Sequence, residues 1–190
     1  TPLAPREVRV RTKACGLCHS DYHVIDGTLV RPRPHVLGHE AAGVVEEVGS
    51  QVTAFRPGDH VVTCLVMGCG ECKRCAQGQP TLCTGSAVTK REARQHTADG
   101  RAITPFANVG GLTEEIVIDE RGLVAIGDDV PMDLAAILGC AVVTGLGAVF
   151  NVAQVQPGET VAVIGCGGVG LNVVQGARIA GASQIIAVDL

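Results

Sequence analysis

Apolar and polar residues alternate in several short runs along the first two thirds of the chain. Alternation with a period of two is typical of strands that bury one face of a sheet. Turn-forming residues such as Pro57-Gly58-Asp59 separate the runs and mark the ends of strands. The pattern therefore predicts a compact β-rich domain with strands over residues 7–11, 41–48, 60–66 and 111–118.

The last third of the chain follows a different pattern. Residues 160–164 and 184–188 are continuous apolar runs, which are typical of strands buried on both faces of a parallel sheet. A glycine-rich loop at 165–170 and a stretch at 171–180 that favours a helix lie between them. This order predicts a βαβ unit. The two domains that we predict are residues 1–142 and 143–190.

Residues 134–153 carry no charge and are long enough to cross a bilayer. Glycines and polar residues interrupt this segment, however, and neither an aromatic belt nor a basic flank accompanies it. We therefore expect a buried helix or helix pair that begins near Pro131. We expect the polar segment over residues 84–108 to form a long surface loop.

Composition narrows the class of protein and of partner. The 190-residue chain can bury a sizeable core, and its net charge of −4 comes with no run of like charges. We therefore expect small-molecule partners, with neither nucleic acid nor a membrane among them. The nine cysteines are an odd number, cluster at metal-like spacings and follow no signal peptide, which favours a cytoplasmic location. Because the chain opens within a strand pattern and closes directly after another, we expect a segment truncated at both ends.

Four cysteines in the run CGECKRCAQGQPTLC are spaced by three, three and eight residues. Thiolates spaced in this way can reach one ion from a single tight loop, and four of them complete the tetrahedron that zinc prefers. The alternatives are a redox C-x-x-C pair or a cluster of disulfides. Because four protein ligands leave no position for substrate, metal catalysis would need a second, open site. The four residues are Cys69, Cys72, Cys75 and Cys83.

The loop after the strand at 160–164 fits the pattern G-x-G-x-x-G and opens a helix. Such a loop lets the backbone and the helix N-terminus approach a pyrophosphate. Asp189 ends the next strand, where an acidic residue binds the adenosine ribose and favours NAD over NADP. The alternative is a glycine turn without a ligand. The residues that we expect to contact the dinucleotide are Gly165, Gly167, Gly168, Val169, Gly170 and Asp189.

Two further runs offer metal ligands beside carboxylates, and both lie in the β-rich domain. The first is CGLCHSDYH, which contains Cys15 and Cys18, and the second is GHEAAG, which contains His39. Taken alone, His39 would be a packed histidine more often than a ligand.

The motifs GLCHSDYH, GHEAAG, the four-cysteine loop, LGCAVVTGLGA and VIGCGGVG occur in this order along nearly the whole chain. In this the chain resembles the zinc-dependent alcohol dehydrogenases of the medium-chain dehydrogenase/reductase superfamily. The resemblance implies a β-rich GroES-like catalytic domain, followed by the first βαβ unit of an α/β Rossmann domain that binds NAD. It also implies two zinc ions per full-length subunit.

The resemblance implies a ligand set for each zinc ion. The catalytic zinc would be held by Cys18, His39 and Cys140, and Cys15 would not be a ligand although it completes a C-x-x-C pair with Cys18. The structural zinc would be held by the four cysteines of residues 69–83.

The resemblance also implies roles for side chains around the zinc. Ser20 would take the proton of the substrate and pass it through the cofactor ribose to His23. Asp21 would orient His39, and Glu40 would be the carboxylate behind the metal that helps its ligands exchange. His19 would lie against the cofactor pyrophosphate and Thr144 would line the nicotinamide pocket.

The function implied is hydride transfer between an alcohol, or its aldehyde or ketone, and NAD through a zinc-bound alkoxide. Rivals with the same fold act on a thiol adduct of formaldehyde or on a polyol. An alternative from another functional class is a nucleotide-binding fragment that zinc stabilises and that catalyses no reaction. We expect activity of a full-length, homo-oligomeric parent, a dimer or tetramer, and not of the isolated segment.

Overall fold

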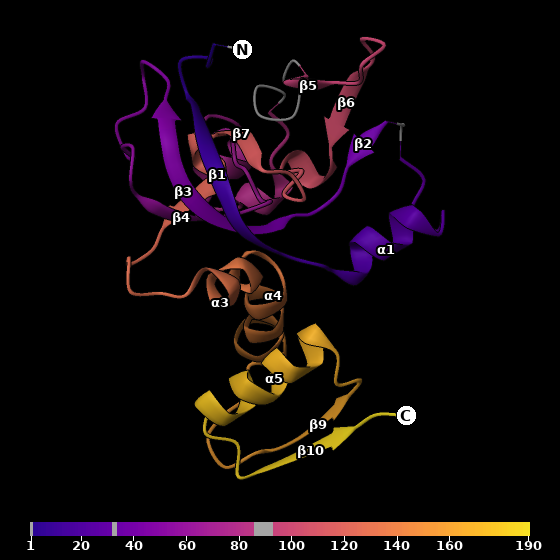
Figure 1. Ribbon diagram of the computed structural model, residues 1–190. Coiled ribbons are helices and arrows are strands. Elements are labelled where there is room, and N and C mark those ends of the chain that lie inside the picture. The colour runs from indigo at the N-terminus through magenta and orange to yellow at the C-terminus, as the bar shows by residue number, and fades with distance from the viewer. Residues whose placement is uncertain (1, 32–33, 86–92) are drawn as a thin grey trace. The chain divides into compact units, whose positions relative to one another are not determined.

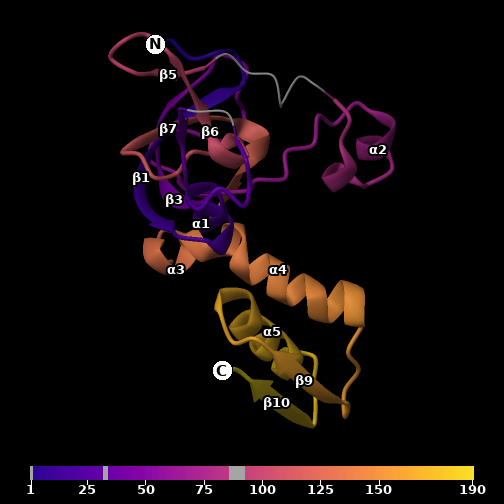
Figure 2. The same cartoon turned by 90° about the vertical axis from the view of Figure 1, so that its right-hand side faces the viewer.

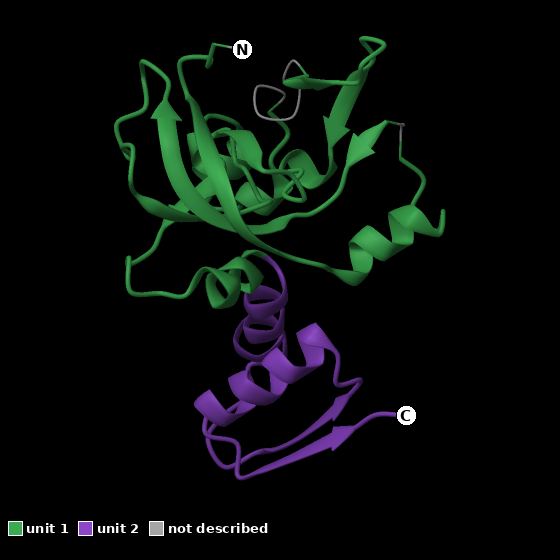
Figure 3. Cartoon of the chain, in the orientation of Figure 1, with its two compact units in different colours: residues 1–139 green, residues 140–190 purple. Residues whose placement is uncertain are grey.

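A computed structural model of the chain describes residues 2–31, 34–85 and 93–190. The chain forms two compact units, Thr1–Gly139 and Cys140–Leu190 (Figures 1 and 3). The division follows Gly139, three residues before the predicted boundary after residue 142. Each unit is described in turn.

The first unit is built on a five-stranded antiparallel sheet with the strand order β7-β1-β3-β4-β8. Four of these strands overlap the alternating runs from which strands were predicted, and the short β8 was not predicted. The β-rich character of this domain is therefore confirmed. The strands are β1 (Glu7–Gly16), β3 (Glu40–Val48), β4 (His60–Thr63), β7 (Glu115–Asp119) and β8 (Leu123–Ala125).

Alternate residues of the central strands form the core of this unit. Val8 and Val10 of β1 lie beside Ile116 and Ile118 of β7, and all four side chains are buried. Burying a valine or isoleucine side chain contributes about 1.5–3 kcal/mol to folding. The core thus rests on the same alternation that predicted the strands.

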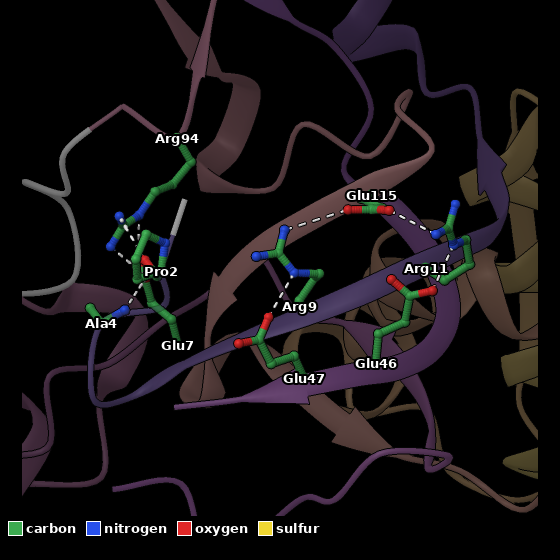
Figure 4. A network of polar contacts seen from close by, with 9 residues as sticks. All are labelled: Pro2, Ala4, Glu7, Arg9, Arg11, Glu46, Glu47, Arg94 and Glu115. Atoms are coloured by element: carbon green, nitrogen blue, oxygen red, sulfur yellow. Dashed lines mark hydrogen bonds and ion pairs between the residues drawn. The ribbon is translucent and has the colours of Figure 1, made fainter. Parts of the chain in front are cut away.

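The intervening residues of the same strands are charged and form ion pairs across the sheet (Figure 4). Arg9 contacts Glu47 on β3 and Glu115 on β7, at 3.1 and 3.5 Å, and Arg11 contacts Glu46 and Glu115, at 2.8 and 2.7 Å. Opposite charges on neighbouring strands favour one register. If one strand slipped by one residue, each charged side chain would lie opposite an apolar side chain instead of its partner of opposite charge.

A second, three-stranded sheet has the order β2-β6-β5. Part of it falls in residues 84–108, which we expected to form a long surface loop, so that prediction is wrong for the described part of the segment. Residues 86–92 of that segment lie outside the described residues. The strands are β2 (His35–Val36), β5 (Gln95–His96) and β6 (Ala102–Pro105), and the 3-10 turn η2 (Phe106–Asn108) follows β6.

Short helices connect the strands of the first unit. The sequence pattern did not predict α1, which begins after Cys18 and buries only Asp21 and Val24. It did predict α3, whose first turn follows Pro131. These elements are α1 (His19–Ile25), α2 (Lys73–Ala76), η1 (Pro80–Leu82), η3 (Glu120–Gly122), α3 (Met132–Ala136) and η4 (Ile137–Gly139).

The second unit contains two parallel strands joined by a helix, in the predicted order. The elements are α4 (Ala141–Gly147), the π-helical η5 (Ala148–Ala153), β9 (Thr160–Ile164), α5 (Gly168–Ile179) and β10 (Gln184–Val188). α4 packs on α5 at Gly145, where a Cβ atom would lie 2.6 Å from the Cβ of Asn172. The strands are less buried than predicted, since Val163 is the single buried residue of β9 and the side chain of Ile164 is 86% exposed.

The apolar segment over residues 134–153 forms helical elements, as predicted, but they are only partly buried. Val149 is buried, whereas Val143 and Val152 are exposed. Among the described residues no single helix has the length and apolar composition to span a membrane. The consecutive helices Met132–Gly139 and Ala141–Ala153 meet those two criteria only when taken together as a bent pair.

Candidate metal and nucleotide sites

The four cysteines of residues 69–83 converge on one point in the first unit. Their segment is folded by α2 and η1 and lies to one side of the main sheet (Figure 2). The four sulfur atoms lie within 4.8 Å of one another, and the Cys69–Cys75 and Cys72–Cys83 Sγ distances are 3.9 and 4.0 Å. A zinc–sulfur distance of about 2.3 Å gives a tetrahedron with edges of about 3.8 Å. The four sulfurs therefore fit a single zinc ion, and we name them the four-cysteine centre.

Backbone N–H groups point at these sulfurs and favour their ionised form. The N–H groups of Cys69 and Gly85 both donate to Sγ of Cys83, and that of Cys72 donates to Sγ of Cys69, each at 3.3 Å. Hydrogen bonds from the backbone of Cys75 and Thr84 lower the pKa of Cys72 to about 5.

The third cysteine of the loop behaves in the opposite way. A backbone hydrogen bond from Gly70 lowers the pKa of Cys75, but desolvation and the neighbouring sulfurs outweigh it and raise the pKa to about 11. Four thiolates cannot gather at this distance unless a cation neutralises them. The electrostatics of the loop are those of a metal centre. The disulfide alternative does not fit, because all four residues carry free thiols and a disulfide has an S–S distance of about 2.05 Å.

Arg121 joins the four-cysteine centre to the main sheet. Its Nη1 atom donates to the carbonyl oxygen of Cys69 at 2.7 Å, while Nε and Nη2 donate to the two carboxylate oxygens of Asp119 at 2.8 and 2.9 Å. Burial raises the pKa of Asp119, but the hydrogen bonds and the charge of Arg121 outweigh it and hold that pKa below its usual range. Sequence reasoning missed Arg121, because nothing in its spacing from the cysteines marks it.

Donor atoms of another set of side chains meet where β1 ends and β3 begins. Gly16 of β1 pairs with Glu40 of β3, so the antiparallel register brings Cys18, which follows β1, beside His39 and Glu40. One donor atom from each of Cys18, His39 and Glu40 lies within 4.8 Å of the others. We name this set the Cys18–His39–Glu40 centre. A thiol and an imidazole are the donors that zinc prefers, so the residues present fit a zinc ion.

The carboxylate of Asp21 contacts the backbone or side chain of residues in this centre and fixes their positions. This carboxylate is fully buried and accepts hydrogen bonds from the N–H groups of Cys18 at 3.0 Å and Gly38 at 2.8 Å. Oδ2 of Asp21 also lies 3.4 Å from Nδ1 of His39, a buried atom without a hydrogen bond of good geometry. Because Nδ1 faces the carboxylate, Nε2 is the atom of His39 left for a metal ion.

Cys140 is the first residue of the second unit, and the peptide bond attaches it to Gly139 of the first. A Cβ atom on Gly139 would lie 2.6 Å from the carbonyl oxygen of Thr63 and 3.5 Å from that of His39. Consecutive Cα atoms are about 3.8 Å apart. The chain itself therefore holds Cys140 within one residue of a glycine that packs against His39.

The predicted relay residues share α1. Ser20 and His23 are half-buried, and Nδ1 of His23 lies 3.7 Å from Oδ2 of Asp26 at the end of the helix. His19 is exposed, and its ring lies edge-on to that of His23 with their centres 4.5 Å apart. α1 thus follows the ligand candidate Cys18 directly and carries a hydroxyl and two imidazoles.

The glycine loop of the second unit has the backbone that its sequence requires. Gly165 has a φ of +92°, which favours glycine, and a Cβ atom on Gly170 would collide with the carbonyl oxygen of Gly165. α5 begins at Gly168, so its first N–H groups have no partner within the helix and face the loop.

Asp189 lies against the same loop. Its carboxylate accepts hydrogen bonds from the N–H groups of Cys166 at 2.5 Å and Leu190 at 2.7 Å, and these lower its pKa. Thr144 lies on α4, the helix that packs on α5, and is exposed. The second unit thus brings the loop, a helix N-terminus and a carboxylate together.

Comparison with known proteins gives consistent matches over nearly the whole chain. The family profile of the alcohol dehydrogenase GroES-like domain matches residues 4–128. The S-(hydroxymethyl)glutathione dehydrogenase of Saccharomyces cerevisiae is 42% identical over 192 residues, an alignment that covers 97% of this chain and 50% of that protein.

Solved structures show the same likeness. An alcohol dehydrogenase zinc-binding domain protein from Burkholderia ambifaria is 40% identical with a TM-score of 0.86, over 97% of this chain and 52% of that one. An acetophenone reductase from Geotrichum candidum, solved in complex with NAD, is 29% identical with a TM-score of 0.82, over 100% of this chain and 52% of that one. The chain spans about half the length of the relatives that it matches.

Proposed function

The chain belongs to the family of alcohol dehydrogenase GroES-like domains, and from this premise we propose that it is part of a zinc-dependent oxidoreductase. The complete protein transfers hydride between an alcohol, or the matching aldehyde or ketone, and NAD. The observation that carries the proposal is the convergence of a thiol, an imidazole and a carboxylate at the Cys18–His39–Glu40 centre. A mixed donor set with room for a substrate is typical of catalytic zinc.

We propose that Cys18, His39 and Cys140 hold this zinc ion. The short covalent path from Gly139 to Cys140 supports the third ligand, and Glu40 stands close to the other two. A zinc ion held there supplies Lewis-acid polarisation of a substrate oxygen. The four-cysteine centre has no open position and therefore holds a second, structural zinc ion.

The remaining residues of the centre orient donors and carry the proton. Asp21 fixes the ring of His39, because its carboxylate faces Nδ1. Ser20 accepts the proton that the substrate hydroxyl releases as it gives up its own, and His23, on the same helix, receives that proton and passes it to solvent. The shared helix α1 supports this path, because it begins immediately after Cys18.

The second unit supplies part of the NAD site as the first βαβ unit of a Rossmann domain. The parallel pair β9–β10, the glycine loop and the N-terminus of α5 support this proposal. Residues of the loop approach the pyrophosphate, Asp189 binds the adenosine ribose, and His19 and Thr144 contact other parts of the cofactor. The relatives are about twice as long as this chain, and we infer that the complete protein supplies the rest of that domain.

A second candidate substrate is a thiol adduct of formaldehyde. The name of the Saccharomyces relative, an S-(hydroxymethyl)glutathione dehydrogenase, supports it, because that protein is 42% identical to this chain. The polar group oxidised is a hydroxyl in either case, so the same metal centre serves both substrates. Side chains outside the centre decide between them.

The test is an assay of NADH formation by the complete protein. We expect turnover with simple alcohols or with S-(hydroxymethyl)glutathione, and the ratio of their kcat/KM values identifies the substrate class. Turnover with neither, in a protein that binds zinc and NAD, would favour the non-catalytic zinc-stapled module and overturn the proposal. A polyol panel in the same assay checks the remaining candidate.

The cofactor preference has its own test at Asp189. Replacing Asp189→Ser removes a charged acceptor for the ribose and the repulsion of a 2′-phosphate. A hydrogen bond to a charged group contributes about 1.5–3 kcal/mol, so the preference for NAD over NADP should fall about 10- to 100-fold. An unchanged ratio of kcat/KM for NAD and NADP would refute this role of Asp189.

A further inference from the structure

Gly16, the last residue of β1, lies directly opposite Glu40, the first residue of β3. The backbone of Gly16 is outside the left-handed region, so its φ angle makes no demand for glycine. Any requirement for glycine at this position must come from the space around it.

That space is filled by the side chain of Glu40. A Cβ atom built on Gly16 would overlap Oε2 of Glu40 and would lie 3.1 Å from its Cβ and 3.3 Å from its Cδ. Glu40 is only 3% exposed, so neighbouring atoms enclose its carboxylate, and its Cβ, which no side-chain rotation moves, is also in tight contact. Glu40 thus folds across residue 16 and occupies the volume that the side chain of any other residue would take.

We propose that Gly16 is a positioning residue for Glu40. Because residue 16 has no side chain, the Glu40 carboxylate can lie against the end of β1 and within reach of the donor atoms of Cys18 and His39. A methyl group at residue 16 displaces the carboxylate from this place and crowds it toward the two ligands. The inference deepens the proposed function, on which it rests, by naming what sets the distance between Glu40 and the metal ligands.

A second glycine on the same pair of strands, β1 and β3, offers a matched control. Gly43 of β3 pairs with Thr12 of β1, and a Cβ atom there would collide with the carbonyl oxygen of Arg11 and lie 2.8 Å from Cγ1 of Val10. Crowding at Gly43 therefore involves the backbone of β1 and not Glu40. Removing the Glu40 side chain should relieve the crowding caused by Gly16→Ala but not that caused by Gly43→Ala.

The experiment combines Gly16→Ala and Gly43→Ala, each alone and with Glu40→Ala, in the complete protein. Two measurements need no substrate: the rate at which zinc passes from the Cys18–His39–Glu40 centre to a chelator, and the visible absorption spectrum of the cobalt-substituted centre. We expect Gly16→Ala to change the release rate about 10- to 100-fold, the range typical of groups behind metal ligands. The cobalt spectrum should shift with it.

In the Glu40→Ala background, Gly16→Ala should have little further effect on the release rate or on the cobalt spectrum. Any change that Gly43→Ala causes in these two measurements should be of the same size with and without the Glu40 side chain. Equal effects of Gly16→Ala in both backgrounds, or none in either, would overturn the inference. If Gly16→Ala alone does not fold, recovery of folding in the double variant supports the inference and a double variant that also fails to fold contradicts it.

The two levels of proposal fail in different ways. A protein that binds no metal through Cys18 refutes the proposed function and this inference with it. A protein that binds metal there and shows no coupling between residues 16 and 40 refutes this inference alone.

Discussion

The two candidate metal centres of the first unit are assembled in opposite ways. The four-cysteine centre takes all its donors from residues 69–83, and they are folded by two short helical turns. The Cys18–His39–Glu40 centre takes its donors from the ends of two strands, and the pairing of β1 with β3 brings them together. One centre is therefore a property of a short segment, and the other is a property of the sheet.

The surroundings of the centres differ as much as their assembly. Three of the four cysteines are partly exposed, and their partners are sulfurs and backbone N–H groups. His39, Glu40 and Asp21 are at least 97% buried, and a carboxylate faces the imidazole. Four identical ligands close a coordination sphere, whereas a mixed set tuned by buried charges suits chemistry at an open position. The difference indicates that the Cys18–His39–Glu40 centre serves the reaction and that the four-cysteine centre stabilises the fold.

Loss of a ligand at the buried centre should give the largest effect on turnover. Cys18→Ala removes a thiolate whose metal supplies several kcal/mol of charge stabilisation, so kcat/KM should fall at least about 1,000-fold. The variant should stay folded and keep the metal of the four-cysteine centre, which steady-state kinetics and metal analysis together would show.

The control for this variant is Cys15→Ala, which removes another thiol of the same strand region. Burial raises the pKa of Cys15 to about 11, and its sulfur is not among the donor atoms that converge at the Cys18–His39–Glu40 centre. We expect kcat/KM to change little. A collapse of turnover in Cys15→Ala with normal turnover in Cys18→Ala would reverse the assignment.

Loss of a ligand at the four-cysteine centre should appear chiefly as lost stability. Cys72→Ala opens the tetrahedron, and losing a structural metal lowers the free energy of unfolding by more than about 4 kcal/mol. Chemical denaturation of the complete protein measures this, with Cys64→Ala as the control, because Cys64 is a partly buried thiol outside both centres. Equal stabilities of the two variants would remove the structural role of this centre.

Asp21→Asn should weaken the buried centre without removing a ligand. The amide keeps the shape of the carboxylate but loses its charge toward Nδ1 of His39 and one of the two oxygens that accept N–H groups of Cys18 and Gly38, which should lower the metal affinity there about 10- to 100-fold. A chelator competition assay measures it, and metal release from the four-cysteine centre should not change. Asp26→Asn, at the end of the same helix, is the control and should leave both affinities unaltered.

The smallest effect is expected at Arg121, which connects the four-cysteine centre to the sheet. Arg121→Ala removes the hydrogen bond to the carbonyl of Cys69, and because this side chain is partly exposed we expect about 3- to 10-fold faster metal release. Arg101→Ala, which breaks an exposed ion pair with Asp99, serves as the control. The same release rate in both variants would show that the loop holds its metal without help from the sheet.

Local pattern was sufficient for most of the main sheet and for the four-cysteine centre. Strands with one buried face repeat every two residues, so the runs that contain Val8, Val45, Val61 and Ile116 could be recognised directly. The spacing of the cysteines likewise contains the whole geometry of a loop that closes on one ion. Neither prediction needed contacts between distant residues.

Other features depend on contacts that no local pattern encodes. α1 is a short helix held by the buried carboxylate of Asp21, and its sequence shows no stripe of apolar residues. The proximity of Cys18 to His39 follows from the register of β1 and β3, and the resemblance to a family pointed to the pair before the register was known. Gly16 opens the motif GLCHSDYH, but its contact with Glu40, like the contact of Arg121 with Cys69, depends on tertiary structure that the sequence does not show.

Several predictions from the sequence remain to be tested. They include the roles of Ser20, His23 and Thr144, the homo-oligomeric state and the cytoplasmic location. Each concerns the complete protein, and this chain spans about half the length of the relatives that it matches.

The central claim is that the chain holds two metal centres, of which only the Cys18–His39–Glu40 centre is open to chemistry. The most direct test is the zinc content per subunit of the complete protein and of Cys18→Ala and Cys72→Ala. We predict two zinc ions in the unaltered protein and one in each variant, with turnover abolished by Cys18→Ala whereas folded Cys72→Ala remains active. One zinc ion in the unaltered protein, or two in Cys18→Ala, would contradict the account.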